Sequence, residues 1–482
     1  MSRWLSYLRS ASFTTANVAA YAATDGRFVL LEGRLRGRKF HNWALRYRHE
    51  PEEFHRPTTQ AQIIALIRRF RRLRVVGSGH SFNSGIVSDQ VLVSLDDYAG
   101  LVRFDAATHQ VTVRGGTRVR DVVKIMLDRG LAFNALPSHD AQSIAGILST
   151  DVHGTGRDWG FVSQSVVGLT VIDGTGQVHQ CTPDDDLFRA AIGGVGAVGI
   201  ITEVTVQGVP RFAIRQRTRI EEVARLQKTL PQLLAGHDHL SLYLFPYADH
   251  CQVNTWDRST EPTTRGGELK EFVNISADAL LAAWAGDLIA HTGLLRLARH
   301  WSRLGYQIRR GTQLILESDN AHNRTMYHLH QELEFTVPYE RTFEICDSML
   351  ELYQQMYAAR PLPYLLLEVR FTPADHDLSL IGPGTGRRST WIDLIINDTE
   401  GFERFYAAAV ELIKSVSGRP HLGKYTDGFA ADDLRQLYGE RFCQLRRLVA
   451  QHDPDGKFSN SFTRRMLGDP VAAAGDWGRR TP

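Results

Sequence analysis

Cysteine is scarce in this 482-residue chain, and its four cysteines, Cys181, Cys251, Cys346 and Cys443, form no CxxC pair. Their spacing excludes a disulfide framework and a cysteine-based zinc site, and it is typical of a protein from a reducing compartment. No apolar run approaches the roughly 20 residues that a membrane-spanning helix needs. The net charge of only +3 leaves no electrostatic footprint for nucleic acid, so we expect no nucleic-acid partner. We also expect no metal among the site residues.

What remains is a composition with 43% hydrophobic and 23% charged residues, which is ordinary for a globular chain long enough for two or more domains. Residues 1–50 hold no acidic residue before Asp25 and carry Arg3 and Arg9 among serines, threonines and alanines. This resembles an organelle presequence, but we favour an N-terminal tail and an arm leading into the first domain. We therefore expect a cytoplasmic protein, with a mitochondrial or membrane-peripheral location as the alternative. Residues 468–482 are expected to be disordered.

The most informative stretch runs from Leu73 to Asn83 and reads LRVVGSGHSFN. Gly77 and Gly79 lack a Cβ, so the chain can turn sharply there and let a phosphate or a ring approach the backbone N–H groups. His80 stands where this turn is most exposed. The alternative is an ordinary glycine-rich turn in which His80 has no role, because short glycine motifs recur by chance.

Around this stretch, strands and helices alternate. A helix is expected after Thr59, which can cap it, with an apolar stripe that includes Ile63 and Ile67. Its arginine-rich face, residues 68–72, is interpreted as a solvated surface rather than a nucleic-acid site. Strands are expected at 91–95 and 111–114, and a helix at 117–126. This alternation predicts α+β or α/β layers.

Two polar segments follow, at 136–146 and 149–156, rich in small and hydroxyl residues. Such segments can converge on a pyrophosphate, although a long surface loop is the alternative. Residues 194–199 match GxGxxG, but they follow a helical segment and lead into the strand at 200–206. A dinucleotide fingerprint requires the opposite order, so we reject a Rossmann site here.

The pattern changes after Pro210. Alternating residues predict strands at 240–245 and 364–371, and a helix is expected at 340–357. Residues 277–304 are amphipathic and helical. They could lie on a membrane surface, but helices that cover a sheet or a partner subunit are the favoured interpretation.

Five blocks, spread in order from about residue 55 to 465, resemble the vanillyl-alcohol-oxidase-type flavoproteins and, within them, the aldonolactone and alditol oxidases. They are residues 77–82, 143–154, 199–204, 368–370, and 421–424 with 453–460. The resemblance implies an α+β fold with a PCMH-type FAD-binding domain of two α+β subdomains at 51–212. It further implies a substrate domain at 213–415, built on an antiparallel sheet with covering helices, and a segment at 416–467 that returns to the flavin.

The resemblance also implies which residues hold FAD. His80 matches the histidine that is bonded covalently to the flavin, and imidazole is a competent neutral nucleophile near neutral pH. No cysteine lies between the two FAD segments, so a single histidyl bond is expected. The remaining expected FAD contacts are Val76, Gly77, Ser78, Gly79, Ser81, Ser138, Ser143, Gly146, His153, Gly154 and Ile201.

For catalysis, Glu368 and Arg370 are one residue apart on a strand, so both side chains point to one face. An acid and a guanidinium in one pocket fit hydroxyl recognition, with Arg370 opposing developing negative charge. By resemblance, Lys424 polarises or deprotonates the reacting hydroxyl, and Ser143 contacts flavin and substrate. Asp393 and His421 are expected on the substrate side. The alternatives are a cross-strand ion pair and a surface lysine.

Three positions bear on how this chain compares with the family pattern. Leu422 replaces the family's tryptophan, which affects the packing beside Lys424. Asp151 stands where relatives have glycine, and a carboxylate near a diphosphate is unfavourable unless it turns away or meets an arginine. Pro137 lies where family oxidases tend to carry a small residue or proline, which favours oxygen as the acceptor.

The resulting expectation is oxidation of a sugar-derived alcohol, an aldono-1,4-lactone or a polyol, by hydride transfer to covalent FAD, with O2 reduced to H2O2. The first alternative is the same chemistry with a cytochrome or quinone acceptor. A reductase or epimerase is disfavoured because such relatives generally lack the linking histidine. From a different class, the chain could be a non-catalytic flavin-binding or nucleic-acid-binding protein.

Overall fold

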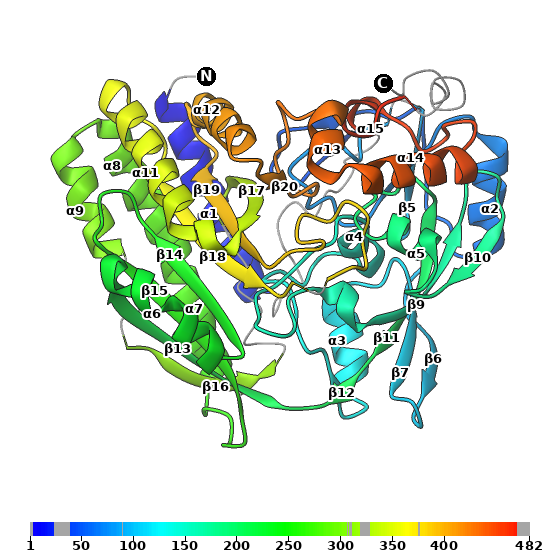
Figure 1. Cartoon of the computed structure of the whole chain (residues 1–482), viewed down its shortest axis with the longest axis horizontal. Helices are drawn as coiled ribbons and strands as arrows, with labels where there is room; N and C mark the ends of the chain where they lie inside the picture. Colours follow the sequence, from blue (N-terminus) through cyan, green and yellow to red (C-terminus); the bar gives the residue numbers. More distant parts are fainter. Residues whose placement is uncertain are drawn as a thin grey trace.

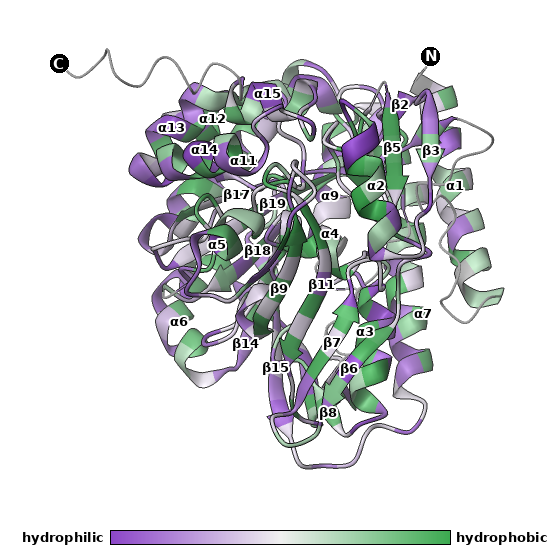
Figure 2. Cartoon of the chain, turned by 90° about the vertical axis from the view of Figure 1, so that its right-hand side faces the viewer, coloured by the Kyte–Doolittle hydropathy of each residue, from purple (hydrophilic) through white to green (hydrophobic). Residues whose placement is uncertain are grey.

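The computed structural model describes residues 3–23, 39–88, 90–305, 307, 311–318, 328–374 and 376–469. Two layered α+β halves lie side by side, one on the right and one on the left in Figure 1. The order of the elements confirms the α+β class expected from the sequence. Figure 2 shows that the inner strands β5 (Val91–Ser94) and β9 (Val166–Ile172) are strongly hydrophobic, whereas helices α13 (Ala431–Tyr438) and α14 (Glu440–His452) carry hydrophilic surfaces.

The first half begins with a small parallel sheet in the order β3-β5-β4. Its strands are β3 (Glu53–His55), β4 (Arg74–Val76) and β5 (Val91–Ser94), and α2 (Gln60–Arg69) connects β3 to β4. As predicted, Thr59 caps α2 by accepting a hydrogen bond from the Gln62 N–H, and Ile63 and Ile67 are buried. The glycine turn starts directly after β4, at the carboxyl end of a parallel strand.

The second subdomain of this half is a five-stranded antiparallel sheet in the order β10-β9-β11-β7-β6. The GxGxxG stretch lies between helix α5 (Asp186–Ala191) and strand β11 (Ile200–Gln207), as predicted, so it does not open a helix. The strands are β6 (Leu101–Asp105), β7 (Gln110–Arg114), β9 (Val166–Ile172), β10 (Val178–Cys181) and β11 (Ile200–Gln207). The helices are α3 (Val119–Leu127), α4 (Ile144–Ser149), the 3-10 helix η1 (Val162–Ser165) and α5 (Asp186–Ala191). Two short pairs complete this part: β1 (Phe40–His41) with β2 (Arg48–His49), and β8 (Leu131–Ala132) with β12 (Val209–Pro210).

The other half is an eight-stranded antiparallel sheet in the order β16-β13-β15-β14-β18-β19-β17-β20, as expected for the substrate domain. Its strands are β13 (Ala213–Glu222), β14 (His239–Leu244), β15 (His250–Ser259), β16 (Gln313–Glu317), β17 (His330–Pro338), β18 (Leu365–Thr372), β19 (Ser389–Asn397) and β20 (Arg419–Pro420). The covering helices are α6 (Val223–Gly236), α7 (Gly267–Leu280), the π-helix η2 (Leu281–Gly286), α8 (Asp287–Thr292), α9 (Leu295–Gly305), the 3-10 helix η3 (Tyr339–Arg341), α11 (Thr342–Ala359) and α12 (Phe402–Ser415).

Strand register in the middle of this sheet places acidic residues side by side. Glu368 on β18 is opposite Asp393 on β19, and Asp393 is in turn opposite Glu334 on β17. Because successive side chains of a strand alternate between faces, residues paired across strands share a face. Three carboxyl groups therefore form a row across three strands.

The C-terminal segment, with α13 (Ala431–Tyr438), α14 (Glu440–His452) and α15 (Ser461–Leu467), lies over the first half (Figure 1). Its Lys424 loop is tied to the glycine turn: the Phe82 N–H donates to the Gly423 carbonyl at 2.9 Å. The Asn83 amide donates to the carbonyls of Leu422 and Lys424 at 2.6 and 3.0 Å. These bonds bring residues more than 300 positions apart into one wall.

The expectation of an N-terminal tail is wrong for residues 3–23, which form helix α1 (Arg3–Ala23). Its buried residues are mostly small or polar, namely Ser6, Ser10, Ala11, Thr14 and Asn17, together with the aromatic Tyr7. A helical stripe with so few apolar side chains does not stand out in a hydrophobicity pattern, which is why it was missed. The remaining arm, residues 24–38, and most of the expected disordered tail, residues 470–482, lie outside the described residues.

Candidate active site

A large cavity lies between the glycine turn, residues 77–80, and helix α4. Its volume is about 980 Å³ including the open mouth, a size that suits a cofactor. The backbone N–H groups of Ser78, Gly79 and His80 make no hydrogen bond within the described residues, so they are free for an anionic ligand. A Cβ at Gly77 would lie 2.2 Å from the Ser143 hydroxyl oxygen, so a larger residue there would displace the Ser143 side chain from the cavity wall. These residues fit the pyrophosphate-bearing cofactor that the sequence implies.

Most of the expected FAD contacts line this first cavity: Val76, Gly77, Ser78, Gly79, His80, Ser81, Ser143, Gly146 and Ile201. Ser138 and His153 instead line a second cavity next to it. Gly154 lines neither, contrary to expectation. Its N–H donates to the Gly160 carbonyl, and a Cβ would lie 2.6 Å from the Leu136 carbonyl oxygen, so this glycine is required by tight backbone packing.

His80 stands between the two cavities and belongs to the wall of both, as does Gln142. The centre of the His80 ring lies 4.3 Å from that of His139, with 3.4 Å between the two Nε2 atoms. The His80 ring also stacks on Trp43, with 6.1 Å between the ring centres. Burial, with the nearby His139, holds the pKa of His80 well below its usual value. His80 is therefore a neutral imidazole at neutral pH.

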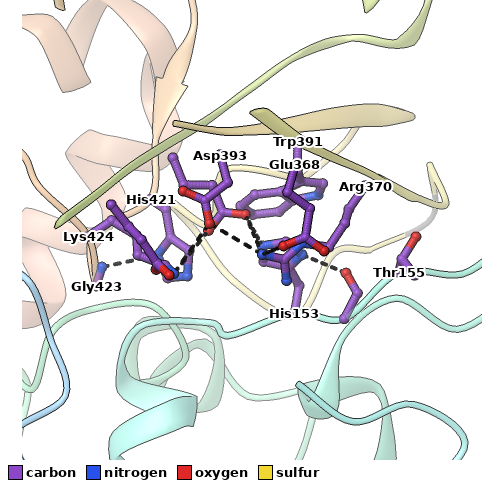
Figure 3. A network of polar contacts seen from close by, with 12 residues as sticks. His153, Thr155, Glu368, Arg370, Trp391, Asp393, His421, Gly423 and Lys424 are labelled. Atoms are coloured by element: carbon purple, nitrogen blue, oxygen red, sulfur yellow. Dashed lines mark hydrogen bonds and ion pairs between the residues drawn. The ribbon is translucent and has the colours of Figure 1, made fainter. Parts of the chain in front are cut away.

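The second cavity, of about 690 Å³, contains the predicted catalytic residues Glu368, Arg370 and Lys424. Figure 3 shows Asp393 of β19 between Lys424 of the C-terminal loop on one side and Glu368 and Arg370 of β18 on the other. Arg370 Nη2 lies 3.5 Å from a Glu368 oxygen and 3.4 Å from oxygens of both Glu334 and Asp393. Burial would lower the pKa of Arg370, but these three carboxyl groups outweigh it and raise the pKa further. Arg370 is thus a permanent buried cation.

Glu334 links the two cations of the network. It accepts a hydrogen bond from His153 Nε2 at 3.0 Å and lies 3.8 Å from Lys424 Nζ. Burial would raise the pKa of Glu334, but His153 and Arg370 reverse that effect and lower it to about 2. Burial and the neighbouring Glu334 raise the pKa of Asp393 well above its usual value. Within this row of acids, Glu334 holds the negative charge and Asp393 favours the protonated form.

Lys424 Nζ contacts a Glu332 carboxylate oxygen and lies 3.6 Å from Asp393. The other Glu332 oxygen accepts a hydrogen bond from His330 Nε2 at 2.9 Å, which fixes the orientation of the Glu332 carboxylate. Burial lowers the pKa of Lys424 to about 7, while the contact with Glu332 acts in the opposite direction. An amine with a pKa in this range can exchange a proton at neutral pH.

The family model described as D-arabinono-1,4-lactone oxidase matches residues 204–466, and that of an FAD-binding domain matches residues 51–182. The chain belongs to the D-arabinono-1,4-lactone oxidase family. It is 30% identical to the L-gulono-1,4-lactone dehydrogenase of Mycobacterium tuberculosis, covering 89% of this chain and 98% of that protein. It is 26% identical to the L-gulonolactone oxidase of Bos taurus, covering 90% and 99%.

Among solved structures, cholesterol oxidase from B. sterolicum matches with a TM-score of 0.69 at 16% identity, over 89% of this chain and 96% of that one. A solvent-stable cholesterol oxidase matches with a TM-score of 0.71 at 16% identity, over 90% and 97%. These likenesses concern the fold alone. The family match and the lactone oxidases and dehydrogenases among the relatives make the chain an FAD-dependent oxidoreductase of the aldonolactone oxidase type.

In this family member, sequence reasoning found Glu368, Arg370 and Lys424 but missed other residues of the second cavity. They are Trp43, His139, His330, Glu332 and Glu334. A signal for three of them was present, because His330, Glu332 and Glu334 alternate along one strand and so share a face. Of the expected substrate-side residues, His421 lines the cavity. Asp393 does not line the cavity; its carboxyl group instead lies 3.4 Å from Arg370 Nη2 and 3.6 Å from Lys424 Nζ.

Asp151, the departure from the family glycine, turns away from the first cavity. One carboxylate oxygen accepts from the Ser163 hydroxyl at 2.9 Å, and the other lies 2.9 Å from His376 Nε2. The residue is fully buried with a φ of +49°, a left-handed conformation for which the family's glycine is the usual solution. Its charge therefore does not face the cofactor cavity.

Two groups among the described residues bring enough ligand atoms together for a metal ion: His153 with Glu334 and His421, and Asp173 with His179 and His452. The first group belongs to the network above, and the guanidinium of Arg370 lies 3.4 Å from Glu334, which opposes a second cation there. In the second group, one Asp173 oxygen already accepts from His179 Nε2 at 2.7 Å. The residues of both groups are accounted for by these contacts.

Proposed function

We propose that this chain oxidises a hydroxyl of an aldono-1,4-lactone, or of a related polyol, in the second cavity while FAD occupies the first. The observation that carries the proposal is the shared wall: His80 and Gln142 border both cavities. A cofactor anchored at His80 therefore borders the cavity that holds Glu368, Arg370 and Lys424. The names of the relatives support a lactone as the substrate class.

When bound, FAD supplies the two-electron acceptor that takes the hydride from the carbinol carbon. The chain must then remove the hydroxyl proton, and Lys424 is the base. Burial brings its pKa to about 7, so a neutral amine is available at neutral pH. Glu332 contacts the Lys424 Nζ and keeps the side chain in place.

Arg370 stabilises the negative charge that develops on the substrate oxygen as the proton leaves. The guanidinium is oriented by Glu368, Glu334 and Asp393, each about equally distant from Nη2. Glu368 also lines the cavity and can accept a hydrogen bond from a neighbouring hydroxyl of the substrate. Burial of this network excludes water and strengthens each of these interactions.

We also propose that FAD is attached to the chain by a single bond to His80. The neutral state of this imidazole supports the proposal, because the nucleophile needs a free ring nitrogen. His80→Ala should bind FAD that acid denaturation releases, whereas the wild-type flavin should stay with the precipitated protein. His300→Ala, on the exposed surface of α9, is the control and should retain its flavin. Flavin that remains attached in the His80→Ala variant would place the bond elsewhere.

For the acceptor we propose O2, with H2O2 as the product, because Pro137 lines the second cavity and lies where family oxidases tend to carry a small residue or proline. A second candidate is a cytochrome or quinone acceptor, since the M. tuberculosis relative is named a dehydrogenase. The two differ only in how electrons leave the flavin.

The test is anaerobic bleaching of the purified yellow protein by a panel of aldonolactones, alditols and aldoses, followed by air. Bleaching by a lactone with rapid recolouring supports the oxidase. Bleaching without recolouring establishes a dehydrogenase that needs another acceptor. If no lactone or polyol bleaches the flavin, the proposed substrate class is wrong.

A further inference from the structure

We propose that helix α1 fixes one wall of the substrate cavity, with Phe13 as the positioning residue for Trp43, an inference that rests on the proposed function of that cavity. Trp43 lines the second cavity. Its indole stacks on the ring of His80, which borders both cavities. The orientation of this indole therefore shapes the space in which the substrate meets the flavin.

Hydrogen bonds hold the backbone of Trp43 but not its ring. The Trp43 N–H donates to the Gly79 carbonyl at 2.7 Å, and the Asn42 side-chain amide donates to the Ser81 carbonyl at 3.0 Å. These bonds fix this part of the chain against the glycine turn. The buried indole Nε1, in contrast, has no hydrogen-bond partner among the described residues. Packing must therefore set the orientation of the ring.

The packing around the indole comes from both sides of the cavity wall. Phe82 and His330 contact it with ring centres 6.1 and 5.0 Å away, and both line the cavity themselves. Phe13 contacts the indole edge-to-face, with 6.2 Å between the ring centres and 83° between the planes. This arrangement is a favourable one for an aromatic pair. Phe13 does not line the cavity, so it acts on the substrate only through Trp43.

Helix α1 is anchored to the substrate half, although it comes first in the sequence and lies beside α7 in both views (Figures 1 and 2). Arg9 forms an ion pair with Asp398 at 2.5 Å, and the Ser10 hydroxyl donates to the Leu329 carbonyl at 3.5 Å. Asp398 directly follows strand β19, and Leu329 directly precedes strand β17. The helix therefore connects the ends of two strands that carry acidic site residues to the ring of Trp43.

Residues 3–23 lie outside the ranges matched by the two family models, 51–182 and 204–466. The contact between Phe13 and Trp43 is thus an addition to the part of the chain that those models describe. The alternative role for α1 is that of a brace, which would affect stability without a specific effect on the substrate. The two roles differ in KM, because a displaced cavity wall weakens substrate binding while the reacting groups stay in place.

The test is steady-state turnover of full-length holoprotein variants with the lactone that bleaches the wild-type flavin. Phe13→Ala should raise KM about 3- to 10-fold, because an edge-to-face aromatic pair favours one ring orientation by roughly this factor. kcat should stay within about twofold, and the flavin content should not change. Phe13→Tyr keeps the ring and should restore the wild-type KM. Leu8→Ala, which changes a residue on the same helix that is 48% exposed, is the matched control and should behave like the wild type.

A double-mutant cycle tests whether the effect passes through Trp43. Trp43→Leu should itself raise KM, and Phe13→Ala should add no further rise in that background, because residues that act through one contact are not additive. The proposal is overturned if Phe13→Ala has the KM of the Leu8→Ala control, or if the two effects multiply. If Phe13→Ala yields no folded holoprotein, Arg9→Gln takes its place and should raise KM by a smaller factor, again only when Trp43 is present.

Near-ultraviolet circular dichroism requires no substrate and separates this proposal from the proposed function. Phe13→Ala should alter the spectrum of the otherwise wild-type protein, because the indole changes its surroundings, and should leave the spectrum of Trp43→Leu unchanged. If no lactone bleaches the flavin but this coupling is seen, the proposed function fails while the positioning of Trp43 by α1 stands. An unaltered spectrum in Phe13→Ala would refute the positioning role whatever the substrate.

Discussion

Replacing Glu332 by glutamine should change the pH dependence of substrate oxidation without removing the base. Lys424 must be neutral to accept the hydroxyl proton, so the rate of flavin reduction should rise with pH through the pKa of this amine. Burial brings that pKa to about 7, and the Glu332 carboxylate in contact with Nζ stabilises the protonated form. The glutamine keeps the size of the side chain and removes its charge.

The expected shift follows from this contact. An opposite charge within hydrogen-bonding distance typically raises the pKa of an amine by about 1 to 3 units, which corresponds to roughly 1.4 to 4 kcal/mol. Loss of the charge therefore lowers the pKa of Lys424, and the acidic limb of the profile should move to lower pH by at least about one unit. Asp393 at 3.6 Å and Glu334 at 3.8 Å from Lys424 Nζ remain in the variant, so the amine keeps these two acidic neighbours.

The assay is anaerobic stopped-flow measurement of flavin bleaching by a reducing lactone from about pH 5 to pH 9. Lys424→Met should abolish the acidic limb and slow reduction, and Glu332→Asp should restore part of the wild-type profile. Glu411→Gln, on the exposed side of α12, is the control and should leave the limb in place. An acidic limb at the same pH in the wild type and in Glu332→Gln would refute the pairing of Glu332 with the base. A limb that persists in Lys424→Met would remove Lys424 from that role.

Two further predictions concern the cofactor cavity and the departure from the family glycine. Gly77→Ala should lose FAD, because its Cβ would lie 2.2 Å from the Ser143 hydroxyl oxygen; the ratio of flavin to protein absorbance measures this. Gly236→Ala, where no atom lies within 4 Å, should keep full flavin content. Asp151→Ala should reduce the free energy of unfolding by about 3 kcal/mol, because it leaves the buried His376 ring and the buried Ser163 hydroxyl without their carboxylate partner. Thermal unfolding followed by circular dichroism would show an unchanged midpoint if this carboxylate were dispensable.

The sequence predicted the elements that have strong local patterns. Helix α2 was located from its cap and apolar stripe, and the GxGxxG stretch was rejected because a strand follows it. Helix α1 was missed because most of its buried residues are serine, threonine, alanine and asparagine, which carry little hydrophobic signal. Asp151 could be flagged as unfavourable near a diphosphate, but its partner His376 lies 225 positions away, and no local pattern connects the two.

The acidic row shows why the remainder of the site depends on three-dimensional register. The spacing of Glu368 and Arg370 fixes a common face, but it does not say which strand lies opposite. Asp393 and Glu334 reach Arg370 only because β17, β19 and β18 are adjacent in the sheet in this register. A shift of one residue in β17 would turn Glu334 to the opposite face and leave Arg370 beside two carboxyl groups, Glu368 and Asp393, instead of three. The charge of the cavity is therefore a property of strand pairing, which the alternation of apolar residues enforces along the whole sheet.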